Sequence, residues 1–499
     1  MDMKKKLDEF KAVKARLSFG GGKGAVDRQH AAGKLTAWER MDLLFDPGTF
    51  RELDLLARPF KTGFDIDNRD LPRDAIVVGY GSVNGRTVYA SCYDYTVAGG
   101  SQGSMQMMKL VKVMEQARKE GLPYVTIIDS TGRRIQDRFG KFGYRVPIRV
   151  EDCGEGQVDM FCPPMASGVI PQISLMLGPC YAGTAYCPMM SDFLIFRKEL
   201  AFMSVASPAL LKSATSATVT QDEIGGALLH ATTTGSADIL VDSDEEALAK
   251  CRELLEFLPA NWTEKPPVCQ TRDNPQRLEE ELLSMIPEEE NKPFDMHRMI
   301  SLIVDEERFF EIAPLYARNM ITGFARLAGQ PVGIVANNSA VAEGCLDANT
   351  CDKEAHFIRT CDCFNIPVIL LVDSPGFLPS FTQEQSPEGI ERHAAKPVFA
   401  LCEATVPKIV VYVRNVFGST RLIMGGRGMN VDSVLAWPSV RFNFGSYPVN
   451  EPYTSGAVMA FEEVIDPRET RPVVIERLRR LSHKQAESRP WRKHGLIQL

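Results

Sequence analysis

Short apolar runs alternate with longer amphipathic stretches along this chain of 499 residues. The runs VYASCYDYTV (88–97), YVTIIDS (124–130) and ISLMLG (173–178) have the length and composition typical of buried strands. Between the first two, GSMQMMKLVKVMEQARKEG (103–121) has the periodicity of a helix and ends at a glycine, a common helix stop. Strands that alternate with helices predict an α/β architecture, in which crossover helices are layered on a sheet.

The same pattern occurs a second time further along the chain. NGRTVYASCYDYTVAGG (84–100) has a counterpart in AGQPVGIVANNSAVAEG (328–344), and GLPYVTIIDSTGR (121–133) has one in NIPVILLVDSPGF (365–377). Both pairs are separated by 244 residues, and in both copies an aspartate closes the apolar run before Ser-x-Gly. Matches in the same order at a constant spacing indicate an internal duplication.

A third pair of segments completes the duplication. VIPQISLML precedes GPCYAGTAYCP at 178–188, and TVPKIVVYV precedes RNVFGSTRLIM at 414–424, an offset of 236 residues. We therefore predict two similar domains, residues 1–256 and 296–499. The segment between them, 257–295, is rich in proline and charge and is predicted to be a linker.

The third block passes from a strand through a turn of small residues into a helix, and it does so in both copies. The first N–H groups of a helix have no partner within the helix and carry partial positive charge. Small residues let a ligand reach them, so such a turn can hold a developing oxyanion. Two such turns suit a reaction between two bound carbonyl compounds. Close packing of helix against strand is the alternative explanation.

The composition narrows the functional classes. The net charge of -7 gives no reason to expect nucleic-acid binding, and no apolar run reaches the roughly 18 residues of a membrane helix. The chain has twelve cysteines but no CxxC pair, which favours reduced core thiols over a metal site. A cytoplasmic location is the expectation that follows.

Several long motifs resemble the carboxyltransferase (beta) subunit of biotin-dependent acyl-CoA carboxylases, of the propionyl-CoA carboxylase beta and methylmalonyl-CoA decarboxylase alpha type. The motifs that carry the resemblance are RQHAAGKLTAWERMDLLFDPGTF (28–50), SGVIPQISLMLGPC (167–180), CDCFNIPVILLVDSPGFLP (361–379), EATVPKIVVYV (403–413), LAWPS (435–439) and RPWRKHG (489–495).

The resemblance implies two tandem crotonase-like domains of the ClpP/crotonase superfamily. It implies hexamers in which each active site combines the N-terminal half of one subunit with the C-terminal half of another. Acyl-CoA would bind the first half and biotin the second, and a carboxyl group would move between biotin and the acyl α-carbon. The chain itself contains no biotin-attachment motif, so biotin would arrive on a separate carrier protein. A biotin carboxylase or membrane decarboxylase subunits would be further partners.

The resemblance also assigns roles to individual residues. By position in the motifs, the backbone amides of Ala182 and Gly183 would stabilise the acyl-CoA enolate, and those of Ser419 and Thr420 the enolate on the biotin side. Gly418 would share the biotin turn. The substrate-binding positions implied are Thr131, Gly132, Arg133, Tyr181 and Leu422.

The glycine-rich blocks depart from the family pattern. Members of the family usually have the sequences DSGGARIQ, GPCAGGA and YGGAYD where this chain has DSTGRRIQ, GPCYAGT and FGSTRL. The C-terminal domain is also expected to be shortened after Pro448. A β-branched threonine does not readily adopt positive φ, so the effect depends on the local backbone. Two alternatives therefore stay open: a CoA-thioester enzyme without biotin, such as a decarboxylase, and a non-catalytic paralogue that assembles with an intact carboxyltransferase subunit.

Overall fold

The computed structural model describes residues 2–134, 158–290, 292–385, 389–444, 447–449 and 451–485. The chain divides into two compact units, Met1–Glu256 and Phe257–Leu499. The expected linker, residues 257–295, lies within the second unit, where it contains helix α12 (Leu282–Met285) and contributes Leu282 to the core. Among the described residues, no helix combines the length and the apolar character needed to cross a bilayer.

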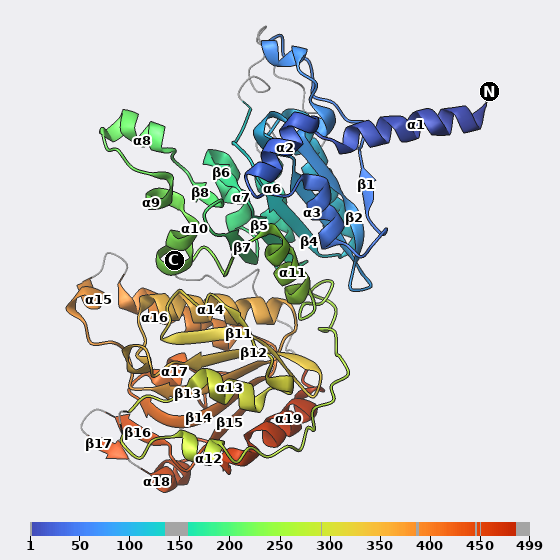
Figure 1. Ribbon diagram of the computed structural model, residues 1–499. Coiled ribbons are helices and arrows are strands. Elements are labelled where there is room, and N and C mark those ends of the chain that lie inside the picture. Colours follow the sequence, from blue (N-terminus) through green and yellow to red (C-terminus); the bar gives the residue numbers. More distant parts are fainter. Residues whose placement is uncertain are drawn as a thin grey trace, which may run out of the picture. The chain divides into compact units, whose positions relative to one another are not determined.

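The first unit is built on a seven-stranded mixed sheet with the order β1-β2-β3-β4-β5-β7-β9 (Figure 1). The first three strands pair antiparallel and the remaining neighbours pair parallel. The strands are β1 (Arg51–Leu53), β2 (Ile76–Val83), β3 (Arg86–Tyr93), β4 (Tyr124–Ile128), β5 (Gln172–Met176), β7 (Phe193–Arg197) and β9 (Ile239–Val241). A separate two-stranded sheet consists of β6 (Pro179–Tyr181) and β8 (Phe202–Ser204).

The helices of the first unit include the one predicted between the first two strands. Helix α4 ends at Glu120, directly before Gly121, the predicted helix stop, which has a left-handed φ of 68°. The α-helices are α1 (Met3–Ser18), α2 (Lys23–Ala31), α3 (Ala37–Leu44), α4 (Ser104–Glu120), α6 (Val158–Ala166), α7 (Tyr186–Met189), α8 (Pro208–Thr215), α9 (Gln221–Gly225), α10 (Ala227–Leu229) and α11 (Asp244–Leu255).

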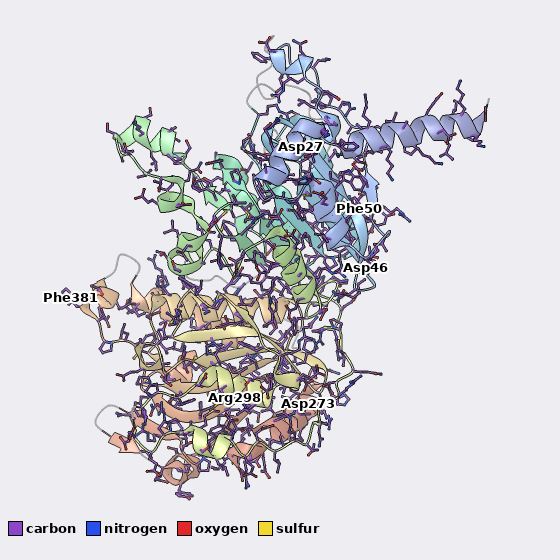
Figure 2. The ribbon with its side chains drawn as sticks, viewed as in Figure 1. Asp27, Asp46, Phe50, Asp273, Arg298 and Phe381 are labelled. Carbon is purple, nitrogen blue, oxygen red and sulfur yellow. The ribbon has the colours of Figure 1, made fainter. Side chains whose placement is uncertain are left out.

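The second unit repeats this sheet, with the order β10-β11-β12-β13-β14-β15-β18. Its strands are β10 (Phe310–Ile312), β11 (Met320–Leu327), β12 (Gln330–Asn337), β13 (Val368–Ser374), β14 (Lys408–Phe417), β15 (Ser433–Ala436) and β18 (Glu463–Val464), with β16 (Arg441–Phe444) on β14 and β17 (Tyr447–Val449) on β16. Its other helices are α13 (Met296–Ile303), α14 (Ala348–Cys363), α15 (Phe381–Gln385), α16 (Ile390–Glu403), α17 (Thr420–Ile423), α18 (Pro452–Ala457) and α19 (Thr470–Leu481). Phe381 of α15 is 75% exposed and stands at the edge of this unit (Figure 2).

The duplication extends to individual hydrogen bonds. The Lys109 ammonium is buried and donates to the carbonyl oxygens of Arg73 and Ile76, at 3.3 and 2.8 Å. Lys353, 244 residues further on, donates to the carbonyl oxygen of Met320 at 2.7 Å. Met320 is itself the counterpart of Ile76, so both units use one buried lysine to hold the start of the second sheet strand. A carbonyl oxygen is a partner that satisfies a buried ammonium without a second charge.

Glu354 is a local exception to this symmetry. It lies on α14 at the position that corresponds to Leu110 of α4, and it is fully buried. Both carboxyl oxygens lack a hydrogen-bond partner among the described residues. Burial raises the pKa of this carboxyl well above its ordinary value of 4.5, because an ionised carboxylate is poorly solvated there. The second unit therefore contains a buried carboxyl group where its twin has a hydrocarbon side chain.

Glu354→Leu is expected to raise the free energy of unfolding of the full chain by about 1–3 kcal/mol, the usual cost of burying an unpaired polar group. The gain grows with pH. The folded-state pKa lies above the unfolded one, so the wild-type chain loses stability as pH rises from about 4.5, and leucine has no such loss. Calorimetric unfolding at pH 5 and pH 8 measures both effects. Glu354→Gln is the control: it should remove the pH dependence without the apolar gain. An equal or lower stability of the leucine variant at pH 8 would show that the carboxyl has a partner.

Candidate functional site

The first predicted turn leaves backbone N–H groups open to solvent. After β6 the chain enters a 3-10 turn, Ala182–Ala185, which leads into helix α7. Ala182 is exposed and Gly183 is half-buried. Among the described residues, no backbone hydrogen bond outside the helices and strands uses the N–H groups of Ala182 and Gly183. The two adjacent donors can therefore hold one ligand oxygen.

A second tight turn, Ser130–Gly132, lies against the first. The Gly132 N–H donates to the Ser130 hydroxyl at 3.1 Å, and Gly132 has a φ of 96° that a side chain would strain. A Cβ on Gly132 would lie 3.6 Å from the carbonyl oxygen of Tyr181. The structure thus brings the predicted positions 131–132 and 181–183 together, although about 50 residues separate them in sequence.

The turn in the second unit has the same construction. Gly418 has a φ of 54° with no atom within 4 Å of a Cβ placed on it, and Ser419 is the N-cap of α17. No backbone hydrogen bond outside the helices and strands of the described residues uses the N–H groups of Ser419 and Thr420 either. Gly376 is the counterpart of Gly132. A Cβ placed on Gly376 would lie 3.5 Å from the carbonyl oxygen of Phe417.

The bulky residues that replace small ones in the family pattern differ in their contacts and exposure. The Tyr181 ring packs on Phe202 with 4.9 Å between centroids, and its hydroxyl accepts from the Gln221 amide of α9. Arg421 is exposed. Arg133 is half-buried, and its backbone forms an isolated parallel β-bridge with Gln102. Leu422, predicted to contact substrate, is 44% exposed. Residues 135–136 of the DSTGRRIQ motif and the RPWRKHG motif at 489–495 lie outside the described residues.

A buried charge cluster lies beneath the first turn. Asp129, at the end of β4, accepts from the Lys34 ammonium at 2.6 Å, from the Arg40 guanidinium at 3.1 Å and from the Gln29 amide at 3.2 Å. Burial lowers the pKa of the Lys34 ammonium, and the Asp129 carboxylate opposes that shift. A Cβ on Gly178 would stand 1.9 Å from Asp129 Oδ1. The glycine that opens the GPC motif is therefore required by this carboxylate.

The second unit neutralises the corresponding aspartate differently. Arg414 occupies the position that Gly178 has in the first unit, and its guanidinium donates to both carboxylate oxygens of Asp373, at 3.1 and 2.8 Å. In the first unit the cations come instead from the N-terminal segment. The ends of β4 and β13 are thus held by equivalent carboxylates with different partners.

The backbone dihedrals settle which departures from the family pattern are strained. Neither Thr131 nor Thr420 has a positive φ, so the β-branched side chains are tolerated. Ala182, which stands where the family has glycine, has a φ of 53°. A left-handed conformation at alanine costs about 1–2 kcal/mol. The strain is therefore located at the residue that presents one of the two first-turn amides.

Ala182→Gly is expected to raise the free energy of unfolding by up to about 1 kcal/mol. Relief of about 1–2 kcal/mol of strain exceeds the loss of about 0.4–1 kcal/mol from the greater freedom of the unfolded chain. Urea denaturation measures the change. Ala185→Gly, in the same turn, is the matched control. It should lower the free energy of unfolding, because Ala185 has an ordinary φ of -71° and no strain to relieve. Destabilisation by both substitutions would contradict the strain at Ala182.

Two parts of the site were not predicted as site residues. The Lys34–Arg40–Asp129 cluster joins residues about 90 positions apart, which no local pattern reveals. The turn Ser374–Gly376 beside the second turn was also not predicted as part of the site. The repeat could have revealed it, because Asp129 and Asp373, which directly precede Ser130 and Ser374, are equivalent positions.

Comparisons with known proteins place this arrangement in a family. The carboxyl transferase domain matches residues 28–444 of the chain. The chain belongs to the carboxyl transferase family. It is 40% identical to the methylmalonyl-CoA decarboxylase subunit alpha of Veillonella parvula over 521 residues, which covers 100% of this chain and 99% of that protein. It is 37% identical to the propionyl-CoA carboxylase beta chain of Roseobacter denitrificans, with 100% of both chains covered.

The solved structures agree with this assignment. The transcarboxylase 12S subunit, solved as a hexamer assembly with methylmalonyl-coenzyme A and methylmalonic acid bound, matches with a TM-score of 0.93 and 36% identity over 100% of both chains. Membership of the carboxyl transferase family confirms the predicted crotonase-like α/β fold. It also confirms the predicted enzyme class, biotin-dependent carboxyl transfer with acyl-CoA.

Proposed function

We propose that Ala182–Gly183 and Ser419–Thr420 are the two oxyanion sites of an acyl-CoA carboxyltransferase, one for each reactant. The observation that supports this proposal is the repeat itself. Each unit has two adjacent N–H groups in the turn that follows the repeated strand, with no backbone acceptor outside the helices and strands among the described residues. The two pairs are offset by one residue, because Ser419–Thr420 correspond to Gly183–Thr184, and Gly418, the counterpart of Ala182, donates to the carbonyl oxygen of Asn443 at 2.9 Å. A single exposed turn has a simple packing explanation, but the same construction in both units suits two carbonyl oxygens.

On the acyl-CoA side, the thioester oxygen would accept from the amides of Ala182 and Gly183. Loss or gain of a carboxyl group at the α-carbon places negative charge on that oxygen, and fixed N–H dipoles stabilise the charge as it develops. The buried cluster behind Gly178 contributes rigidity, because the Asp129 carboxylate and its cations fix the end of β4, and the Ser130 N–H that follows donates to the carbonyl oxygen of Pro179 in β6 at 2.8 Å. Thr131, Gly132, Arg133 and Tyr181 border this turn and are the proposed contacts of the CoA ester.

The second turn fits the ureido carbonyl of biotin. Gly418 has open space where a side chain would be, Ser419 is exposed, and two amides are available for one oxygen. When bound, biotin supplies a nitrogen that carries the carboxyl group, so no side chain of this chain has to do so. Gly418, Ser419 and Thr420 would orient the ring through that oxygen, and Leu422 is a proposed contact of the acyl substrate.

The proposed substrates and partners follow from the relatives. We propose a short acyl-CoA of the propionyl or methylmalonyl kind, a biotin carrier protein, and a biotin carboxylase or membrane decarboxylase subunits as partners. We also propose a hexamer, the assembly named for the transcarboxylase 12S relative. No disulfide joins the cysteines in the described part of the chain, which suits the cytoplasm.

The test is incubation of the purified full chain with malonyl-CoA, methylmalonyl-CoA and propionyl-CoA, each with and without free biotin. The proposed function predicts decarboxylation of a carboxylated ester that requires biotin. Decarboxylation at the same rate without biotin would assign the chain to biotin-independent thioester chemistry. No turnover, together with tight assembly on an intact carboxyltransferase subunit, would make it a non-catalytic subunit.

A further inference from the structure

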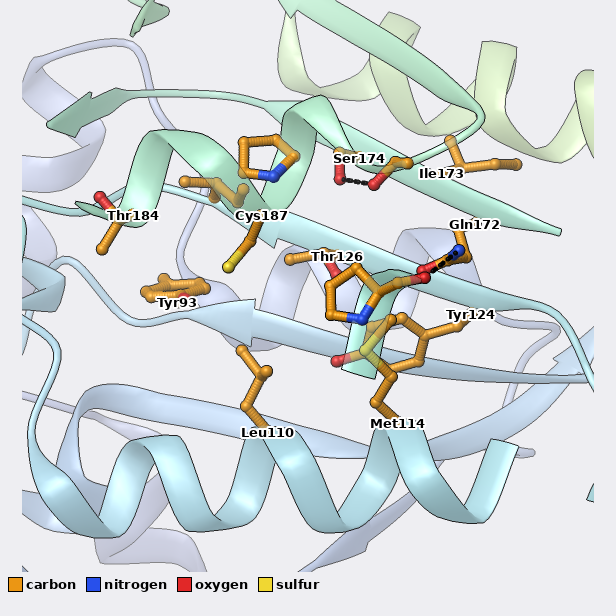
Figure 3. Close-up of a pocket in the computed structure, with 14 residues that line it drawn as sticks. Tyr93, Leu110, Met114, Tyr124, Thr126, Gln172, Ile173, Ser174, Thr184 and Cys187 are labelled. Atoms are coloured by element: carbon orange, nitrogen blue, oxygen red, sulfur yellow. Dashed lines mark hydrogen bonds between the residues drawn. The ribbon is translucent and has the colours of Figure 1, made fainter. Parts of the chain in front are cut away.

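A small cavity lies in the first unit beneath the helix that follows the first turn (Figure 3). Its volume is about 20 Å3, enough for about one water molecule. Thr184, Tyr93 and Leu110 lie toward one end, and Tyr124 and Gln172 toward the other (Figure 3). None of the proposed oxyanion contacts uses this space.

The two ends of the cavity differ in polarity. At the far end, the Gln172 amide nitrogen donates to the carbonyl oxygen of Pro163 at 3.1 Å. The Gln172 Oε1 accepts no hydrogen bond from the described residues. The near end is formed by the Leu110 side chain and the Tyr93 ring, both buried. A group that entered from the side of the turn would therefore meet hydrocarbon first.

Thr184 is the residue between the turn and the cavity. It follows Gly183 directly, it lines the cavity and it is 3% exposed. Its hydroxyl donates to the carbonyl oxygen of Tyr181 at 2.5 Å, which fixes the side chain in place. The Thr184 side chain is therefore held in the wall of the cavity, at the residue directly after the turn.

We propose that Thr184 is a specificity-determining residue that caps this cavity and limits the acyl group at the first turn to short chains. The inference rests on the proposed function, which places the thioester oxygen on Ala182 and Gly183. With that oxygen fixed, the acyl chain starts within a few bonds of Thr184. A smaller residue at 184 joins the apolar end of the cavity to the acyl site and admits a longer straight chain.

Four variants separate the cap from other roles of Thr184. Thr184→Ala opens the cap. Thr184→Val keeps its volume and removes the bond to Tyr181, so it is the matched control. Leu110→Ala enlarges the cavity but leaves it closed. The double variant Thr184→Ala with Leu110→Ala opens the enlarged space.

The measured quantity is the preference for hexanoyl-CoA over propionyl-CoA, as a ratio of kcat/KM for carboxylation with carboxybiotin as the carboxyl donor and as a ratio of Kd from calorimetric titration. One methylene in an apolar pocket changes such a ratio by about 10- to 200-fold. Thr184→Ala should raise the preference for hexanoyl-CoA about tenfold, and Thr184→Val and Leu110→Ala should leave it within twofold. The double variant should exceed the product of the single effects, because the enlarged space is reached only when the cap is absent.

Equal shifts with valine and alanine would overturn the proposal, as would a shift with Leu110→Ala alone. The titration distinguishes this failure from a failure of the proposed function. If the wild-type chain binds no CoA ester, the acyl site at the first turn is wrong and the inference falls with it. If it binds the esters but Thr184→Ala leaves the Kd ratio unchanged, only the cap is wrong.

Discussion

Carboxyl transfer is expected to slow by about 100- to 1,000-fold when the amide N–H of Gly183 is replaced by an ester oxygen. Incorporation of glycolic acid at position 183 makes this change and adds no bulk. The exchange removes one of the two donors that face the thioester oxygen, and that donor acts most strongly when the oxygen carries negative charge. The effect should therefore appear in kcat as well as in kcat/KM.

The control for the ester is the same exchange at Gly121. Gly121 also donates through its backbone N–H, to the carbonyl oxygen of Arg118 at 3.3 Å, but it terminates helix α4 away from the turn. Its ester should lower stability slightly and leave kcat within threefold. If the Gly183 ester kept kcat within threefold as well, the first turn would not be an oxyanion site.

Arg40→Met is expected to destabilise the chain by about 3–5 kcal/mol, a large part of the 5–15 kcal/mol typical of a folded domain. Arg40 is completely buried and donates to Asp129 at 3.1 Å and to Asp244 at 2.8 Å. Methionine has a similar length but no charge, so both carboxylates lose a charged partner in a site with little water. Urea denaturation and the midpoint of thermal unfolding measure the loss.

Lys112→Met is the matched control for this prediction. Its ion pair with Asp54 has the same type of contact, at 2.9 Å, but the two side chains are 50% and 30% exposed. Solvent screens such a pair, so the substitution should cost less than about 1 kcal/mol. Similar losses for both variants would mean that the buried cluster contributes no more than a surface pair.

The elements that depend on local pattern were predictable from the sequence. The helix over 104–120 and its stop at Gly121 follow from apolar periodicity and from the backbone freedom of glycine. The duplication was visible in three spaced matches, and it predicts the paired turns directly. These features need only short segments of sequence, which carry their own signal.

The features that depend on long-range contacts were not predictable. The sequence does not show that Ala182 has a left-handed φ, because that dihedral is imposed by the strands and turn around it. It does not show that Lys34 and Arg40 meet Asp129, because helices α2 and α3 reach the strand end only in the folded unit. Glu354 has ordinary helical neighbours in sequence, and only the fold reveals that its carboxyl is buried.

The central claim is that each turn serves one of the two reactants. The most direct test compares the Gly183 ester with the equivalent ester at Ser419, made with glyceric acid, in one exchange assay between a carboxylated acyl-CoA and free biotin. We predict that the Gly183 ester raises the KM for the CoA ester and leaves that for biotin within twofold, and that the Ser419 ester does the reverse. If both esters changed the KM of the same reactant, the division of the two turns between CoA ester and biotin would be wrong.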